Sequence, residues 1–388
     1  LQQHTKDFVI AGGIYVPGPG TNCLFSQFQG LSSQDCCPMD ARASGVIFSE
    51  GAAFVGLKRL SDAVSDGDTI HGVINGFGLS SDGKSSSVNI PKSKGQIIAI
   101  KSAYDRSGID PKEIQFIETH ATSTKVGDMT ELSSIQAFYG SNQKIYLGAV
   151  KALIGHTGWA AGVAAIIKIC LSLKNKTIPR QFNFNKFSED INIDQEKFTV
   201  PITSVEWQEN QYGKIRKAAV NGFGFGGTNA HFIVEEYKAG HYKKEITTDR
   251  TPIKSVVLFP KVKISSTASK NLPENKIILP DVLDEMDSSQ FMGLQIADML
   301  LSSFPGYDAN HTHVVVAYRG KTRRSKQINL RVYLDYIMSA LLKSGKFEQQ
   351  EVHEIEESIK GKVPASGPYT LIGMMPNIIS GRIANCFN

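Results

Sequence analysis

The sequence is poor in the features that mark secreted, membrane-spanning and nucleic-acid-binding proteins. Its 388 residues include only five cysteines, an odd number at irregular spacing without a CxxC pair, which argues against a disulfide framework and a zinc site. No apolar run reaches the roughly 18–20 residues of a membrane span, and no signal-peptide pattern opens the chain. The formal charge of +5 is mild and not concentrated, so nucleic acid is not an expected partner. These absences predict a cytoplasmic protein with reduced thiols.

What is present over the first part of the chain is an α/β rhythm, in which short apolar runs alternate with longer amphipathic stretches. Strands are predicted at 7–11, 46–57, 69–76, 114–119, 145–149, 217–221 and 231–236, and helices at 94–106, 128–139 and 157–174. The last of these helices is apolar on nearly all sides, with Thr157 placed to cap it. Such a helix is expected in the interior.

The composition changes after about residue 237. Residues 238–276 are rich in Lys, Thr and Ser, which predicts a linker with one strand at most, at 255–259. A second folded part is predicted from 277 to 388, with helices at 285–303, 329–344 and 348–360 and a strand at 313–318.

Three stretches carry residues suited to chemistry, and the first runs from Glu118 to Asp128. It places His120 at the end of a predicted strand, where α/β sheets build their sites. A histidine there is also often a structural hydrogen-bonding residue, so the stretch alone does not decide the function.

The second stretch places Lys151 and His156 just before the predicted helix 157–174. The positive end of a helix disfavours a protonated imidazole. A neutral histidine that donates a hydrogen bond is what negative charge developing on a substrate oxygen requires. A helix-capping histidine beside a solvated lysine is the alternative.

The third stretch, 221–231, reads Asn-Gly-Phe-Gly-Phe-Gly-Gly-Thr-Asn-Ala-His. Four glycines around two aromatics predict an irregular loop whose N–H groups can approach a ligand, with a Phe as a movable lid. The pattern fits neither GxGxxG nor GxxxxGK[ST], so it does not predict a phosphate loop. A tight connection between strands is the alternative.

In this order, the three stretches resemble the β-ketoacyl synthase family of the thiolase-like fold. Its members carry His-Gly-Thr-Gly-Thr, then Lys-Ser-Asn-Ile-Gly-His, then Gly-Phe-Gly-Phe-Gly-Gly-Thr-Asn-Ala-His, and the segments 9–13, 25–32, 38–40 and 49–52 also resemble the family. The resemblance covers about 1–237. It implies an α/β protein with a thiolase-like layered α/β/α/β/α fold, here incomplete, from a type I polyketide synthase or a polyunsaturated-fatty-acid-synthase-like megasynthase.

The resemblance implies an acyltransferase that joins an acyl thioester to a malonyl-type extender by decarboxylative Claisen condensation. The partner would be acyl carrier protein, whose phosphopantetheine arm carries the substrates, with no cofactor or metal beyond it, and the domain would form a homodimer. His120 and His156 would bind the extender and stabilise its enolate, and Lys151 would set the charge state around the second histidine. The backbone N–H of Phe225 would supply half of an oxyanion hole.

The resemblance also assigns substrate- and pantetheine-binding positions, which are Thr122, Thr124, Gly224, Gly226, Gly227 and Asn229. The chain departs from the family where Ala121 and Ser123 replace glycines, and both are expected to be tolerated unless φ is positive there. Met129 replaces a proline. Leu153 replaces an asparagine, which puts a local hydrogen bond in doubt.

The family's cysteine nucleophile would precede Leu1, and none of the five cysteines present fits its place: Cys23, Cys36, Cys37, Cys170 and Cys386. The chain by itself is therefore expected to be inactive. Residues 285–290 and 375–385 resemble parts of the family that come before the nucleophile. We expect 1–237 to be the C-terminal part of one ketosynthase domain, 238–276 a linker, and 277–388 the N-terminal part of a second, with a permuted single domain as the alternative.

Two other functions compete with a condensing enzyme. A non-elongating ketosynthase-like scaffold or chain-length factor is the main alternative, although such relatives often lose one of the two histidines. A thiolase or a chalcone-synthase-like enzyme is disfavoured by Thr122, Thr124 and the glycine-rich stretch.

Overall fold

The computed structural model describes residues 1, 5–84, 87–140, 144–212, 214–242, 278–302, 306–309, 312, 314, 316, 322–375 and 377–387. They belong to two compact units. The described residues of the first unit fall within 1–16, 32–82 and 91–242. Those of the second unit fall within 17–31, 83–90 and 278–387.

A six-stranded mixed sheet lies at the centre of the first unit. Its strands, in spatial order, are β3 (Val73–Ser81), β10 (Thr228–Glu235), β9 (Lys217–Gly224), β4 (Phe116–Glu118), β5 (Ile145–Gly148) and β7 (Phe198–Thr199). The short strand β4 is parallel to both of its neighbours, whereas β10 is antiparallel to both β3 and β9. Because β4 has strands on both sides and is fully buried, the chain that leaves its carboxyl end starts from the interior of the sheet.

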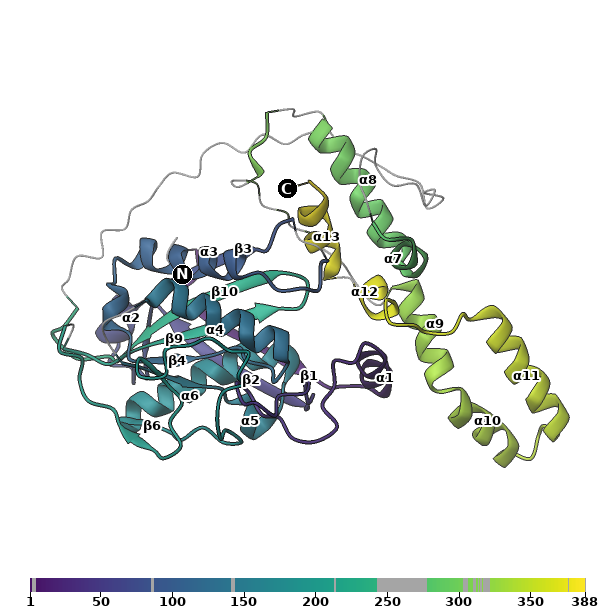
Figure 1. Cartoon of the computed structure of the whole chain (residues 1–388), viewed down its shortest axis with the longest axis horizontal. Helices are drawn as coiled ribbons and strands as arrows, with labels where there is room; N and C mark the ends of the chain where they lie inside the picture. The colour runs from purple at the N-terminus through teal and green to yellow at the C-terminus, as the bar shows by residue number, and fades with distance from the viewer. Residues whose placement is uncertain are drawn as a thin grey trace. The chain divides into compact units, whose positions relative to one another are not determined.

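Helices cover both faces of this sheet (Figure 1). The helices α3 (Ser93–Ser107) and α4 (Lys125–Tyr139) pack on one face, where Ile117 of β4 points. The helix α6 (Ala161–Asn175) packs on the other face, against the neighbouring residue Phe116. Alternation of side chains along a strand therefore serves two cores at once.

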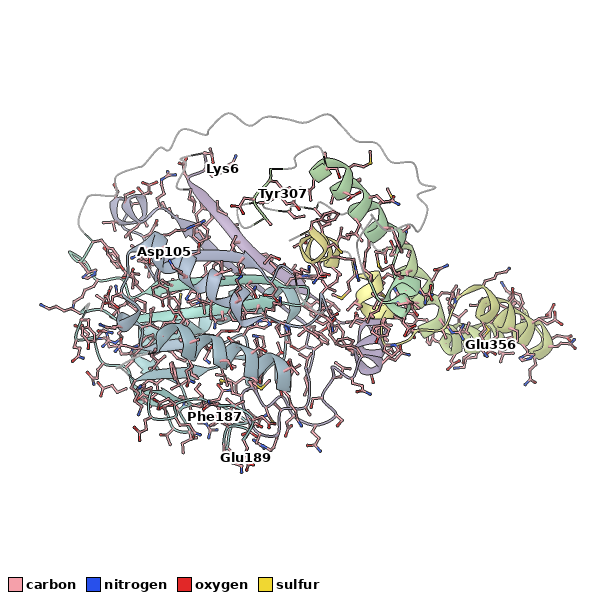
Figure 2. All side chains as sticks on the ribbon, turned by 45° about the horizontal axis from the view of Figure 1, so that its top comes forward. Lys6, Asp105, Phe187, Glu189, Tyr307 and Glu356 are labelled. Carbon is pink, nitrogen blue, oxygen red and sulfur yellow. The ribbon has the colours of Figure 1, made fainter. Side chains whose placement is uncertain are left out.

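A two-stranded antiparallel ribbon of β1 (Phe8–Tyr15) and β2 (Gly51–Lys58) contacts α6. The succession of helices, sheet, helix and ribbon is the layered α/β arrangement that the sequence predicts. The smaller elements of this unit are α2 (Leu60–Ser65), η1 (Pro111–Glu113), α5 (Lys151–Ile154), η2 (Gly158–Ala160), β6 (Thr177–Ile178) and β8 (Val205–Glu206). Asp105 of α3, labelled in Figure 2, is exposed and forms an ion pair with Lys101, which lies one helical turn earlier.

The described part of the second unit is helical. Its helices are α1 (Pro19–Gln27), α7 (Pro280–Glu285), α8 (Ser288–Ser302), α9 (Arg323–Val332), α10 (Leu334–Lys343), α11 (Gln349–Lys362), α12 (Thr370–Met374) and α13 (Ile378–Phe387). The buried Gln290 of α8 accepts a 2.7 Å hydrogen bond from Arg382 of α13. The helices α10 and α11 form a hairpin around Leu334, Met338 and Val352 (Figure 1). Among all described residues, no helix is long and apolar enough to span a bilayer.

Two local predictions are wrong. The glycine-rich stretch is not an irregular loop but a tight connection between strands, the alternative that the sequence left open, because β9 runs through Gly224 and β10 starts at Thr228. The ladder between the two strands overrides the low strand propensity of glycine. Thr157 does not cap a long helix, since a 3₁₀ turn follows it and α6 begins only at Ala161.

Two further predictions concern positions that the structure describes little or not at all. Apart from 238–242, the predicted linker with its strand at 255–259 lies outside the described residues. The predicted strand 313–318 does so too, except for 314 and 316. Both stay predictions.

Candidate active site

His120 lies in the loop that leaves the carboxyl end of β4. The backbone N–H groups of His120 and Ala121 donate hydrogen bonds of 2.8 and 2.7 Å to the two carboxylate oxygens of Glu131 on α4. A carboxylate that accepts from two successive N–H groups fixes the course of the backbone between them. Glu131 thereby determines where the imidazole of His120 can lie.

His156 is held by the segment that precedes β2. Its N–H donates to the carbonyl of Ile47 at 2.7 Å, and its ring lies 5.6 Å from that of Phe48, between centroids. The N–H of Gly158 donates to Nδ1 of His156 at 3.1 Å. Because Nδ1 accepts, the single proton of the neutral ring is on Nε2, which is left as a hydrogen-bond donor.

The two histidines meet although 36 positions separate them in the numbering (156 − 120). Their ring centroids are 5.7 Å apart and the ring planes stand at 86°. Burial, reinforced by the charge of Lys151, lowers the pKa of His156 to about 3. Burial also lowers the pKa of His120 well below 6.5, with Lys151 and His156 adding to the effect. Both rings are therefore neutral at pH 7.

The cause of this neutrality differs from the predicted one. The sequence suggested the positive end of a helix, but a 3₁₀ turn separates His156 from α6. Burial and the ammonium group of Lys151 take that role.

Lys151 is buried at the start of α5, where burial lowers its pKa and the carboxylates of Glu118 and Glu131 act in the opposite direction. Glu118, at the end of β4, is fully buried and accepts hydrogen bonds from the N–H of Val150 at 2.5 Å and from Nζ of Lys168 at 2.6 Å. Glu118 thus joins β4, α6 and the residue before Lys151. The buried Lys151 lies within electrostatic reach of these carboxylates and of both histidines, whose pKa values its charge lowers.

The hydroxyls of Thr122 and Thr124 lie 3.1 Å apart, in the loop that follows His120. Between them, Ser123 has a φ of +66°, the condition under which the sequence prediction no longer expected a serine to be tolerated. Its side chain offsets part of the strain, because Oγ accepts a 2.9 Å hydrogen bond from the N–H of Cys37. The carbonyl of Ser123 also accepts from the N–H of Gly45 at 2.8 Å.

The glycine-rich stretch closes the β9–β10 hairpin. Gly224 ends β9, Phe225 is half-buried at the turn, and Gly226 and Gly227 have φ of +108° and +80°. Asn229 does not point to an open site, because its amide donates to Asp82 at 2.8 Å. These glycines and Asn229 therefore build the turn, and their predicted contacts to substrate stay predictions.

The aromatic ring that accompanies His120 is Phe223 of β9, at 6.4 Å between centroids. Phe223, Glu118 and Glu131 were not predicted from the sequence. For Glu118 a signal existed, since it follows the apolar pair Phe116 and Ile117 in a predicted strand and a buried carboxylate needs partners, whereas Glu131 stands among polar residues of its helix. Phe223 lies just beyond the predicted strand 217–221, because β9 continues to Gly224.

Cys36 is the cysteine that lies within electrostatic reach of Lys151, and it is buried. Burial raises its pKa to about 12, so its thiol is neutral at pH 7. Since the thiolate is the nucleophilic form, Cys36 is unsuited to covalent catalysis. Across the described residues, no group of three or more His, Cys, Asp and Glu side chains could hold a metal ion.

Comparison with protein families identifies three consecutive segments. Residues 1–63 match the N-terminal domain of β-ketoacyl synthases, 71–185 match their C-terminal domain, and 188–271 match the ketoacyl-synthetase C-terminal extension. These ranges include every residue of the site described above.

Curated relatives are large polyketide synthases. The chain is 37% identical over 267 residues to the reducing polyketide synthase ppsB of Aspergillus oryzae, which covers 65% of this chain and 11% of that protein. It is 40% identical over 208 residues to the highly reducing polyketide synthase ausV of Aspergillus calidoustus, covering 52% and 8%. The chain therefore spans only about a tenth of the length of such relatives.

Solved structures agree with the sequence comparison. The ketosynthase from module 6 of the bacillaene synthase of Bacillus subtilis 168 matches with a TM-score of 0.58 and 35% identity, covering 60% of this chain and 42% of that one. The PfaC keto synthase–chain length factor matches with a TM-score of 0.78 and 26% identity, covering 98% and 46%. The first part of this chain therefore belongs to the β-ketoacyl synthase family, as part of a ketosynthase domain of the type I polyketide synthase kind with the thiolase-like fold.

Proposed function

We propose that the protein to which this chain belongs is a β-ketoacyl synthase. It extends an acyl thioester by decarboxylative Claisen condensation in polyketide or fatty-acid biosynthesis. The observation that carries this proposal is the pair of neutral histidines, His120 and His156, whose rings meet edge to face. The proton on Nε2 of His156 supplies a hydrogen-bond donor that does not have to be created during the reaction.

The reaction requires such donors in the step that forms the enolate. When a malonyl thioester loses carbon dioxide, the bond to the carboxylate carbon breaks and its electron pair moves onto the thioester, whose oxygen becomes an enolate. Fixed N–H donors stabilise that oxygen more than the uncharged carbonyl of the ground state. A neutral imidazole also avoids a tight ion pair with the carboxylate that has to leave. Water supplies the proton that turns the enolate into an acetyl thioester when no acyl acceptor is present.

The substrates in this proposal are acyl and malonyl-type groups on the phosphopantetheine arm of an acyl carrier protein. Thr122 and Thr124, half-buried and 3.1 Å apart beside His120, are suited to hydrogen-bond that arm. We further propose a cytoplasmic location, a homodimer formed through the ketosynthase domain, and no need for a metal or a diffusible cofactor.

Condensation, unlike decarboxylation, requires a thiolate to carry the growing acyl chain. The raised pKa of Cys36, to about 12, argues against it as that thiolate. We therefore propose that this chain by itself forms no acyl-enzyme, and we narrow the inactivity expected from the sequence to condensation, because decarboxylation of a malonyl thioester needs no thiolate.

The match to the PfaC keto synthase–chain length factor extends over 98% of this chain, and so includes the helical second unit. This supports the proposal that residues 277–388 begin a second ketosynthase-like domain after the one that ends near residue 237. It also keeps a non-elongating chain-length-factor or scaffold role as the second candidate for the protein.

The experiment is to incubate the purified chain with a malonyl-loaded acyl carrier protein and to follow the carrier protein by intact-mass spectrometry. Conversion of malonyl to acetyl carrier protein, with no mass added to the chain, is the expected result. A succinyl-loaded carrier protein is the control, because its carboxylate is not β to the thioester carbonyl and it should stay unchanged. Malonyl carrier protein that binds but is not decarboxylated would favour the scaffold role.

A further inference from the structure

A chain of buried hydrogen bonds runs from α3 to the loop that carries His120, here called the catalytic loop. Its members take no direct part in the chemistry above. It starts with the hydroxyls of Tyr104 and Tyr139, 2.7 Å apart, on α3 and α4. It continues from Tyr139 to Nε2 of His231 at 3.4 Å, and from Nδ1 of His231 to Oδ1 of Asn221 at 2.6 Å. The amide of Asn221 then donates to Oε1 of Glu131 at 2.8 Å.

The direction of every bond in this chain follows from its last member. Glu131 accepts from two backbone N–H groups, so Asn221 must present its NH₂ group to the carboxylate and its oxygen to His231. His231 therefore donates from Nδ1 and accepts at Nε2, where the hydroxyl of Tyr139 is the donor. Burial lowers the pKa of His231 to about 3, which agrees with a neutral ring.

The arrangement connects α3 and α4 to the catalytic loop through two strands. Oε1 of Glu131 receives both the amide of Asn221 and the N–H of His120, so a displacement of Asn221 changes the bond that positions the histidine. The side chains of this hydrogen-bond chain are buried, and His231 is fully so, so their polar groups depend on one another for hydrogen bonds. A partner lost in such a place leaves an unpaired polar group that the neighbours must move to satisfy.

We propose that His231 is a positioning residue for His120, acting through Asn221 and Glu131. The proposal rests on the ketosynthase role of His120 and deepens it. It assigns a role in the site to a residue of β10, whose partner across the β9–β10 ladder is Asn221. The neutral tautomer of His231 fixes the side-chain amide of Asn221, and that amide and Glu131 together hold the backbone of His120 beside His156.

The test is nuclear magnetic resonance of the full chain labelled with ¹⁵N-histidine, which reports the tautomer and the pKa of each imidazole. In His231→Ala the loop loses its support and admits water, so the pKa of His120 should rise toward 6.5 while that of His156 stays low. The matched control is Val234→Ala on the same strand, a buried side chain that packs in the other core and has no place in the hydrogen-bond chain. It should lower the melting temperature without moving the His120 resonance.

A milder variant keeps the test decisive if His231→Ala does not fold. Tyr139→Phe removes the 3.4 Å bond to His231 and the 2.7 Å bond to Tyr104 but leaves His231 and Asn221 in place, so it should shift His120 in the same direction by less. A His120 signal that is unmoved in the folded variants, or moved equally by Val234→Ala, would overturn the proposal. Because this readout needs no substrate, a wild-type chain that fails to decarboxylate would contradict the proposed function and leave this result to be judged by itself.

Discussion

Nδ1 of His156 accepts a hydrogen bond from the N–H of Gly158, two residues further along the chain. This local contact determines the tautomer of the imidazole and leaves its proton on Nε2. Together with the buried ammonium group of Lys151, it makes His156 a donor that is neutral over the whole physiological range. The predictions below follow from that state and from the residues that maintain it.

The rate of malonyl decarboxylation should show no histidine titration near pH 6.5. The pKa of His156 is lowered to about 3 and that of His120 well below 6.5, so neither ring titrates like a free imidazole. A rate profile measured on the folded chain, with circular dichroism to confirm folding at each pH, checks this. A limb with a midpoint near 6.5 would show that one histidine titrates normally and that its surroundings are not as described.

Replacement of Ser123 should separate backbone strain from hydrogen bonding. Ser123→Ala keeps the positive φ and loses the bond from the N–H of Cys37, so its free energy of unfolding should fall by about 1–3 kcal/mol. Ser123→Gly loses the same bond but adopts the φ without strain, so it should be more stable than the alanine variant by about 1 kcal/mol. Urea unfolding of the three proteins gives the order, and equal stability of the two variants would be inconsistent with the left-handed backbone.

Asp128 should make stability depend on pH in the sense opposite to that of a paired carboxylate. Burial raises its pKa from 3.8 to about 7, so the folded protein keeps a proton there that the unfolded chain loses above 3.8. Stability from this group is complete below pH 3.8 and is lost as the pH rises to 7, by about 4 kcal/mol at most. Asp128→Asn should therefore be more stable than the wild type at pH 8, with a difference that shrinks toward pH 4.

Removing the charge of Glu118 should cost far more than removing an exposed partner. Glu118→Gln leaves the ammonium group of Lys168 beside a neutral amide in a buried place, and the loss should be on the order of 3 kcal/mol. Lys101→Ala breaks the exposed pair with Asp105 (Figure 2) and should change stability by less than about 0.5 kcal/mol. Thermal unfolding monitored by calorimetry compares the two, and similar losses would argue against a buried pair at Glu118.

Much of the fold was predictable, because the periodicity of apolar residues along the chain determines it. The strand that leads to His120, the helices on either side of the sheet and the helical hairpin of the second unit all follow apolar patterns. The glycine-rich stretch was misjudged because its strand character comes from pairing between β9 and β10, which no local propensity records. Thr157 was misjudged for the related reason that the bridge between Phe48 and His156 holds the preceding backbone away from a helical start.

The candidate site also has a part that was predictable from the sequence and a part that was not. His120, Lys151 and His156 were found through motifs, and the structure brings the two rings together beside the lysine. The residues that hold them come from distant positions, such as Glu131 for the loop and Ile47 for the backbone of His156. Nothing in their own neighbourhoods marks them, since their role is set by tertiary contacts.

The most direct test of the account is the release of ¹³C-labelled carbon dioxide from malonyl carrier protein labelled at the free carboxylate. His156→Ala removes the Nε2–H donor and should lower the rate by about 10²–10³-fold, whereas Leu153→Ala, an exposed change three residues earlier, should leave it unchanged. Both variants should keep the fold of the wild type by circular dichroism. Release at the wild-type rate from a folded His156→Ala protein would contradict the claim that this pair of neutral histidines performs the decarboxylation.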